Sequence, residues 1–148
     1  MCDVGDEIPD FSLDSQLGMI KFHDLIDGQL CLVLTVRTAF DPVTTTDIGA
    51  IHKLAEEFEA RNITVVIVGS DNVVNNRKWI KDIEELQLVN VSYPILSDTA
   101  CHVLEMLGCA RVMPPGGTLK PTTLGVFLVD IDKRIRISMR YSPSIGIF

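Results

Sequence analysis

The chain has 148 residues, of which 47% are hydrophobic and 22% charged, and its formal net charge is −7 at pH 7. This length suits one domain with a sizeable core, and the hydrophobic content is too high for a disordered chain. No apolar run reaches the roughly 18 residues that a membrane helix needs. The start of the chain is acidic and does not resemble a signal peptide, so a cytoplasmic or nuclear protein that is not secreted is expected.

The predicted elements alternate between strands and helices. In chain order they are a hairpin at 10–13 and 19–22, a strand at 30–37, a helix at 43–60, a strand at 64–69, a helix at 74–87, a strand at 92–96, a helix at 99–107, and strands at 123–130 and 134–141. The proline- and glycine-rich segment 113–117 is expected to be a loop. This order predicts an α/β protein with a mixed central sheet flanked by helices. From patterning alone, a doubly wound sheet is the competing architecture.

The segment 40–47 joins the apolar strand at 30–37 to an amphipathic helix. Such a turn presents free backbone N–H groups and the positive end of a helix dipole, which suit an anion or a thiolate. Its residues also have a structural explanation, because Asp41 before Pro42 is typical of an N-cap followed by proline at the first helical position. The loop is therefore either a structural helix start or a pocket that binds a ligand without turning it over.

Several motifs share their order and spacing with one known family. They are Gly5-Asp6-Glu7-Ile8-Pro9-Asp10-Phe11, Pro42-Val43-Thr44-Thr45-Thr46, Tyr93-Pro94-Ile95-Leu96-Ser97-Asp98 and Val126-Phe127-Leu128-Val129. Together they resemble the one-cysteine peroxiredoxins, the peroxiredoxin 6 subgroup. The resemblance implies a single domain over 1–148 with a thioredoxin-like fold of the peroxiredoxin type. We expect no cofactor, and the three scattered histidines do not suggest a metal site.

The resemblance also locates the catalytic positions of the family, and three of the four differ here. Thr44 stands at the position of the peroxidatic cysteine, Asp41 at that of the peroxide-binding threonine and Leu124 at that of the activating arginine, while Pro42 is kept. Sulfur can be oxidised to sulfenic acid, whereas a hydroxyl oxygen cannot. Each charge change also disfavours a thiolate by roughly 4 kcal/mol at about 4 Å and an effective dielectric near 20. The sequence therefore predicts a protein that is not an enzyme.

Two other sites of possible chemistry are weaker. Cys101 and Cys109 leave open a residual thiol-dependent peroxidase or a redox sensor, with Arg111 as the nearby cation that could activate a thiol. His23 matches a histidine of the lipid-hydrolysing site proposed for the subgroup, but Gln29 stands where that site has its serine. Because a hydrolase of this kind needs its nucleophile, structural packing is the better interpretation of His23.

The last predicted strand, 134–141, alternates strictly, so Ile135, Ile137 and Met139 are expected to face the core and the arginines to face solvent. In the family this strand lies at the sheet edge and pairs with a second subunit. We therefore expect a homodimer or a protein partner at this edge. The expected interface residues are Arg134, Arg136, Ser138, Arg140, Ile147 and Phe148.

The resemblance implies that the family continues beyond this region with a long helix and a small domain, and we expect this protein to lack both. Loss of that helix is expected to uncover an apolar surface that marks an interaction site. The hypothesis is thus a catalytically inactive peroxiredoxin-like protein that acts as a protein-binding, scaffold or dimerisation module. A regulatory subunit of active peroxiredoxins is an alternative.

Charge is unevenly distributed along the chain. Residues 1–100 hold 17 acidic and 7 basic side chains, whereas residues 101–148 hold 3 acidic and 6 basic ones. The scattered cations lack interleaved aromatic residues and do not indicate a nucleic-acid surface. An acidic partner or self-association is more consistent with this asymmetry, although a solvated face is the ordinary explanation.

Overall fold

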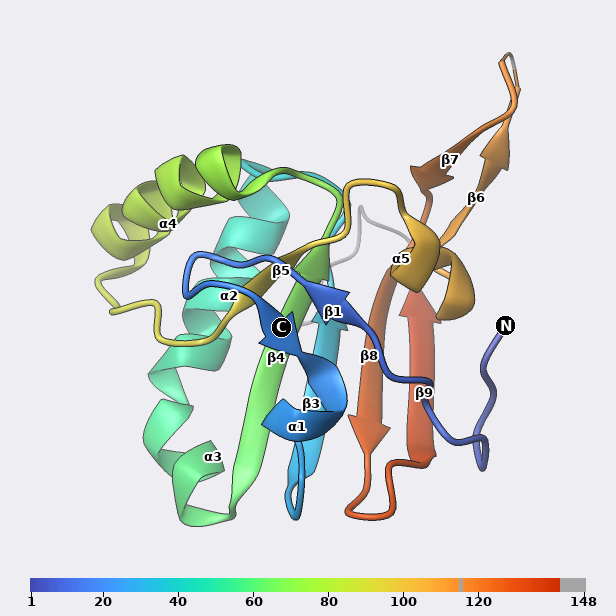
Figure 1. Cartoon of the computed structure of the whole chain (residues 1–148). Helices are drawn as coiled ribbons and strands as arrows, with labels where there is room; N and C mark the ends of the chain where they lie inside the picture. The colour runs from blue at the N-terminus through green and yellow to red at the C-terminus, as the bar shows by residue number, and fades with distance from the viewer. Residues whose placement is uncertain (115, 142–148) are drawn as a thin grey trace.

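A five-stranded mixed sheet in the order β5-β4-β3-β8-β9 forms the centre of the molecule (Figure 1). The computed structural model describes residues 1–114 and 116–141. Strands β3, β4 and β5 run parallel, while β8 and β9 are antiparallel to their neighbours. The sheet strands are β3 (Leu30–Thr35), β4 (Ile63–Gly69), β5 (Ile95–Ser97), β8 (Leu124–Val129) and β9 (Ile135–Tyr141). The predicted mixed sheet flanked by helices is confirmed.

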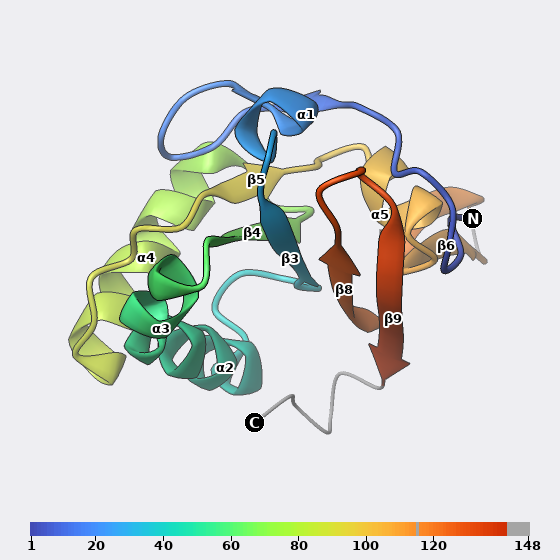
Figure 2. The same cartoon turned by 90° about the horizontal axis from the view of Figure 1, so that it is seen from below.

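Helices cover both faces of this sheet. Figure 2 shows α2, α3 and α4 on one face and α1 and α5 on the other. Their bounds are α1 (Phe22–Leu25), α2 (Pro42–Lys53), α3 (Ala55–Ala60), α4 (Val73–Gln87) and α5 (His102–Met106). No helix in the described part of the chain is long and apolar enough to cross a membrane.

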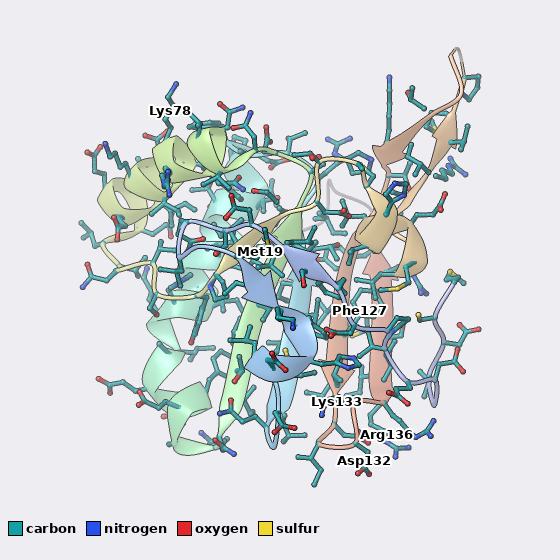
Figure 3. All side chains as sticks on the ribbon, in the orientation of Figure 1. Met19, Lys78, Phe127, Asp132, Lys133 and Arg136 are labelled. Atoms are coloured by element: carbon teal, nitrogen blue, oxygen red, sulfur yellow. The ribbon has the colours of Figure 1, made fainter. Side chains whose placement is uncertain are left out.

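Charged side chains lie around the outside of these layers. Figure 3 shows Lys78 on the outer side of α4, and Asp132, Lys133 and Arg136 near the turn between β8 and β9. At this turn Lys133 forms an ion pair with Asp27 at 3.1 Å, and Arg136 forms one with Asp130. Exposed pairs of this kind contribute about 0–1 kcal/mol each, so the apolar core holds the layers together.

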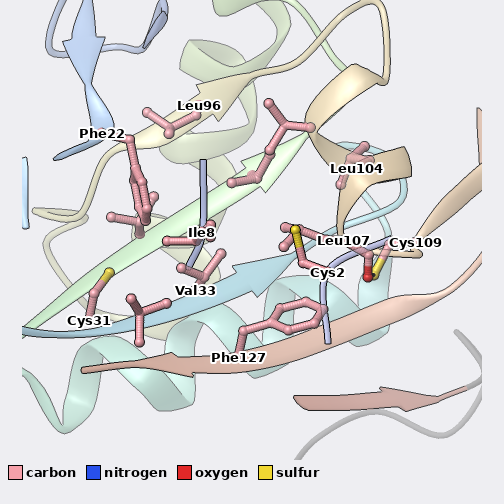
Figure 4. Packing of buried hydrophobic residues seen from close by; sticks show 14 of the residues in the cluster. Cys2, Ile8, Phe22, Cys31, Val33, Leu96, Leu104, Leu107, Cys109 and Phe127 are labelled. Carbon is pink, nitrogen blue, oxygen red and sulfur yellow. The ribbon is translucent and has the colours of Figure 1, made fainter. Parts of the chain in front are cut away.

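Two hydrophobic clusters occupy the two faces of the sheet. On the α1 and α5 side, Phe22, Leu104 and Phe127 pack with Cys31 and Cys109 (Figure 4). On the α2 and α4 side, the cluster combines residues of β3 and β4 with Ile48, Ile51, Trp79 and Ile83. The strands β3 and β4 are buried on both faces, which explains why their sequences are almost continuously apolar.

Two short hairpins accompany the main sheet. The predicted N-terminal hairpin is confirmed as β1 (Ser12–Leu13) paired with β2 (Ile20–Lys21). A second hairpin, β6 (Ala110–Met113) paired with β7 (Thr118–Pro121), was not predicted. The expected loop at 113–117 was placed one residue too early, because Met113 is the last residue of β6 and β7 begins at Thr118. The two strands are too short to show a clear alternation of apolar and polar residues.

The helix predicted over 43–60 is two helices in the structure. α2 ends at Lys53, and α3 begins at Ala55. The residue between them, Leu54, donates its N–H to the carbonyl of Ile51 at 3.0 Å. The bond to a residue three positions back tightens the backbone into a single turn between the helices. Apolar residues continue at helical spacing on either side of Leu54, so the break leaves no signal in the hydrophobic pattern.

The predicted orientation of the last strand is wrong beyond Ile135. Ile135 pairs with Val129 and Ile137 pairs with Leu128, so Arg136 is an extra residue in a β-bulge. A bulge reverses which face the following side chains occupy. Ile135 is buried, but Ile137 and Met139 are 48% and 53% exposed.

The bulge also places Arg140 differently from the prediction. Instead of facing solvent, its guanidinium carbon lies 5.5 Å from the ring centroid of Phe127. Its Nε donates to the carbonyl of Leu107 at 2.8 Å. β9 is nevertheless the outermost strand of the described sheet, as expected. Ile147 and Phe148, named as interface residues from the sequence, lie outside the described residues.

Candidate functional site

The first turn of α2 is closed by a carboxylate. Asp41 is the N-cap, and its Oδ1 accepts hydrogen bonds from the backbone N–H of Val43 at 2.9 Å and of Thr44 at 3.2 Å. Pro42 occupies the first helical position, where its missing N–H costs nothing. The predicted cap is therefore confirmed. The backbone donors that could hold an external anion are already bonded to a negative side chain of the same chain.

Thr44 and Leu124 face a common cavity behind this turn. The cavity measures about 10 Å³ and is lined by Leu34, Thr35, Val36, Thr44, Asp47, Ile48, Ile51, Leu124 and Tyr141. A space of this size holds one water molecule at most. The structure thus brings together the two positions that the sequence analysis aligned with the family's cysteine and arginine. None of the lining residues is a cation.

Tyr141 is a lining residue that the sequence analysis missed. It pairs with Leu124 in the register of β8 and β9, which places it at the same end of the sheet. Burial raises the pKa of the Tyr141 hydroxyl, and the negative charge of Asp47 raises it further. The phenol therefore stays neutral at physiological pH. The strand register could have revealed this residue, since Leu124 and Tyr141 lie near equivalent ends of the two predicted strands.

Asp41 and Pro42 do not line this cavity. Pro42 borders a separate groove of about 380 Å³ between α2 and α4, together with Phe40, Thr45 and Trp79 among others. The indole Nε1 of Trp79 donates to the hydroxyl of Thr45 at 2.9 Å, and that hydroxyl donates to the carbonyl of Asp41 at 2.8 Å. This chain of bonds fixes the first turn of α2 against α4. The sequence does not predict these hydrogen bonds. It indicates only that Trp79 lies on the apolar face of its helix.

The four cysteines are all buried. Burial raises the pKa of Cys2, Cys101 and Cys109, and it raises the pKa of Cys31 to about 12. Because the thiolate is the reactive form, these sites favour inert thiols.

The cation beside Cys109 is not the one expected from the sequence. Arg140 lowers the pKa of Cys109, but burial outweighs this effect. Arg111 is exposed on β6 and is not among the groups that shift the pKa of either Cys101 or Cys109. The proximity of Arg111 to these cysteines in the sequence therefore does not create an activating setting.

His23 and Gln29 have structural partners. The Nε2 atom of His23 lies 2.7 Å from the carbonyl oxygen of Ile8, and its backbone N–H donates to Asp10 at 2.9 Å. The side-chain carbonyl of Gln29 accepts a hydrogen bond from Thr64. These contacts agree with a packing role for His23. Among the described residues no group of histidine, cysteine and acidic side chains could hold a metal ion.

Of the expected interface residues, Arg134 precedes β9, while Arg136, Ser138 and Arg140 lie on this strand and Ser138 is half-buried. Arg134 donates to the carbonyl of Gly5 at 3.0 Å, and Arg136 pairs with Asp130. Arg140 is half-buried among Leu107, Cys2 and Phe127. The arginines thus have partners within the chain, while the exposed apolar residues of this strand are Ile137 and Met139.

The parallel β3–β4–β5 unit, the antiparallel β8–β9 pair and the capped turn before α2 define a peroxiredoxin-type protein with a thioredoxin-like fold. Residues 4–138 match the AhpC/TSA family, and the chain belongs to this family. Its relatives include the 1-Cys peroxiredoxin of Dictyostelium discoideum, 34% identical over 97% of this chain and 58% of that protein. Peroxiredoxin-6 of Mus musculus is 30% identical over 97% of this chain and 66% of its own length.

Solved structures show the same relationship. A cysteine-to-serine mutant of peroxiredoxin 6 from Arenicola marina superimposes with a TM-score of 0.91 at 28% identity, covering 100% of this chain and 69% of the mutant. A yeast mitochondrial 1-Cys peroxiredoxin has a TM-score of 0.88, also at 28% identity, and the match covers 100% of this chain and 71% of that one. The chain spans a little more than half the length of the first curated relatives that it matches.

Proposed function

We propose that this protein is a peroxiredoxin homologue without peroxidase activity, which binds a protein partner or a second copy through the β8–β9 end of its sheet. The observation that carries the proposal is the cavity shared by Thr44 and Leu124. The relatives are named as peroxiredoxins, a class whose chemistry starts from a thiolate. Here the corresponding position holds a hydroxyl, which cannot become a sulfenic acid.

The electrostatic setting supports the same proposal. A thiolate is stabilised by nearby cations, and the cavity lining contains the acidic Asp47 and no basic residue. The carboxylate of Asp41 adds a second negative charge at the start of α2. The alternative based on Cys101 or Cys109 has less support, because burial raises the pKa of both thiols.

The binding role rests on an apolar strip that faces the α2 side of the sheet. It consists of exposed Ile137 and Met139 on β9 and their half-buried strand neighbours Val126 and Leu128 on β8. α2 and α4 cover the same face over β3 and β4 (Figure 2). Adjacent exposed apolar side chains on a sheet face are a common feature of protein interfaces.

The experiment is size-exclusion chromatography with light scattering on the wild-type chain and on the double variant Ile137→Ser/Met139→Ser. The wild type is expected to self-associate or to bind a hydrophobic dye, and the variant is expected to lose both properties. The matched control is Val74→Ser/Leu86→Ser, since these side chains are 59% and 71% exposed on α4. A wild-type chain that stays monomeric and binds no dye would count against the binding role.

A further inference from the structure

The hairpin formed by β6 and β7 extends away from the body of the protein. Figure 1 shows both strands reaching past α5 and beyond the end of the main sheet. Among the described strands, β6 and β7 pair only with each other. The ribbon therefore has two edges without a strand partner in the described sheets, while α5 contacts both of its strands. We refer to residues 110–114 and 116–121 as the arm.

Two cations lie opposite each other on one face of this arm. Arg111 is the direct cross-strand partner of Lys120, and both residues are exposed. Side chains in such a pair have Cβ atoms about 4.5–5.5 Å apart, and like charges at this position destabilise a hairpin. Within the described residues, the side chain of neither cation has a hydrogen bond or an ion pair. The repulsion between them thus has no structural compensation.

Three other cations of the described chain have acidic partners, whereas exposed cations on α4 such as Lys78 and Lys81 have none. Arg61 pairs with Glu57, Lys133 with Asp27 and Arg136 with Asp130. The arm differs because the sequence contains no acidic residue between Glu105 and Asp130, although the whole chain has a net charge of −7. Two facing cations without an acidic neighbour attract negative charge. They can therefore bind carboxylates of another molecule.

We propose that the Arg111–Lys120 face of the arm binds an acidic segment of a partner protein in extended conformation. In an extended segment, alternate side chains point to the same side, so two carboxylates can reach the two cations together. A free ribbon edge can also add the backbone of such a segment as a further strand. A nucleic acid is a poorer fit, because its affinity depends on many phosphate contacts and the net charge of this chain is negative.

The test is fluorescence anisotropy with the full chain and a labelled peptide of alternating glutamate and serine. A peptide of alternating glutamine and serine and a single-stranded oligonucleotide are the comparison probes. The glutamate peptide is expected to bind, more weakly at higher salt, and Arg111→Glu is expected to weaken it by about ten-fold or more. The same variant should raise the melting temperature, because glutamate opposite Lys120 replaces repulsion by attraction.

The matched control is Lys78→Glu, which makes the same change in net charge on the outer side of α4 (Figure 3). It should leave the affinity within about two-fold, while Arg111→Lys should retain binding. The proposal is overturned if the glutamate peptide does not bind or if the glutamine peptide binds equally well. It is also overturned if Lys78→Glu weakens binding as much as Arg111→Glu. Binding of the oligonucleotide in place of the peptide would reassign the arm to nucleic acid.

This site is separate from the apolar strip on β8 and β9. Loss of peptide binding in Arg111→Glu and loss of self-association in Ile137→Ser/Met139→Ser are therefore independent results. Either proposal can fail while the other stands.

Discussion

Thr44 and Leu124 line the same small cavity, although Thr44 lies in the first turn of α2 and Leu124 begins β8. Neither side chain carries a charge or a sulfur atom. A thiol introduced at Thr44 would therefore be buried beside Asp47, without a cation in the cavity lining. Its environment would oppose ionisation.

Thr44→Cys should consequently give a thiol with a pKa no lower than the ordinary value of about 8.5. Adding Leu124→Arg should lower that pKa, because a cation near a thiol favours the charged form. The rate of alkylation by iodoacetamide as a function of pH measures both values. A low thiol pKa in the single variant would show that some other group supplies the missing charge.

Thr45→Val should lower the free energy of unfolding by about 1–3 kcal/mol, since it leaves the buried indole N–H of Trp79 without its acceptor. The matched control is Thr46→Val. The Thr46 hydroxyl is exposed and donates only to the carbonyl of Pro42 at 3.1 Å. Urea denaturation compares the two variants. Equal losses would contradict the role assigned to the bond between Thr45 and Trp79.

The folded protein should lose stability as the pH falls, because His52 resists protonation in the folded state. Burial lowers its pKa below the value of 6.5, and its Nδ1 lies 2.9 Å from the carbonyl oxygen of Ile48. Below pH 6.5 the unfolded chain takes up a proton that the folded chain resists, so unfolding becomes more favourable. Above that pH both states are neutral and this contribution disappears.

The measurement is the urea midpoint of the wild type and of His52→Gln between about pH 5 and pH 7.5. The difference in urea midpoint between the wild type and His52→Gln should shrink or reverse as the pH falls. Only the wild type carries a histidine whose protonation favours the unfolded state. Other groups, such as Asp98, contribute to both proteins and cancel in the comparison. A pH-independent difference would show that the protonation of His52 is not linked to folding.

Leu88→Gly should stabilise the protein by about 1 kcal/mol, because Leu88 ends α4 in the left-handed conformation with φ 55° and is 88% exposed. Glycine adopts this conformation without the steric cost. Leu86→Gly is the control, since it lies inside the same helix and is 71% exposed. That change should destabilise by about 1 kcal/mol. The measurement is the melting temperature in thermal unfolding. Shifts of this temperature in the same direction for both variants would be inconsistent with strain at Leu88.

The thiols should react slowly with Ellman's reagent in the folded protein and rapidly after denaturation. All four cysteines are buried, and burial raises the pKa of each. One fast thiol in the native protein would restore the redox-sensor alternative for Cys101 or Cys109.

The sequence predicted the main sheet and the start of α2 well, because these depend on local signals. Buried parallel strands are continuously apolar, and Asp41-Pro42 is a local capping pattern that the structure confirms. The orientation of β9 could not be predicted in this way. One extra residue at Arg136 reverses the faces of Ile137 and Met139, and a bulge is set by pairing with β8 rather than by the alternation itself.

The candidate site was predictable only in part. The resemblance placed Thr44 and Leu124 at functionally related positions, and the structure brings them to one cavity. Tyr141 and the bond between Thr45 and Trp79 depend on how distant elements pack, for which the sequence has no local signal. The arm was missed because its connection is rich in proline and glycine and its strands are short.

Peroxide consumption by the purified chain with a thiol reductant tests the absence of peroxidase activity most directly. The wild-type protein should consume peroxide no faster than buffer, and prior alkylation of its thiols should change nothing. Turnover above buffer that disappears on alkylation would contradict this and would place the catalytic sulfur on one of the four native cysteines.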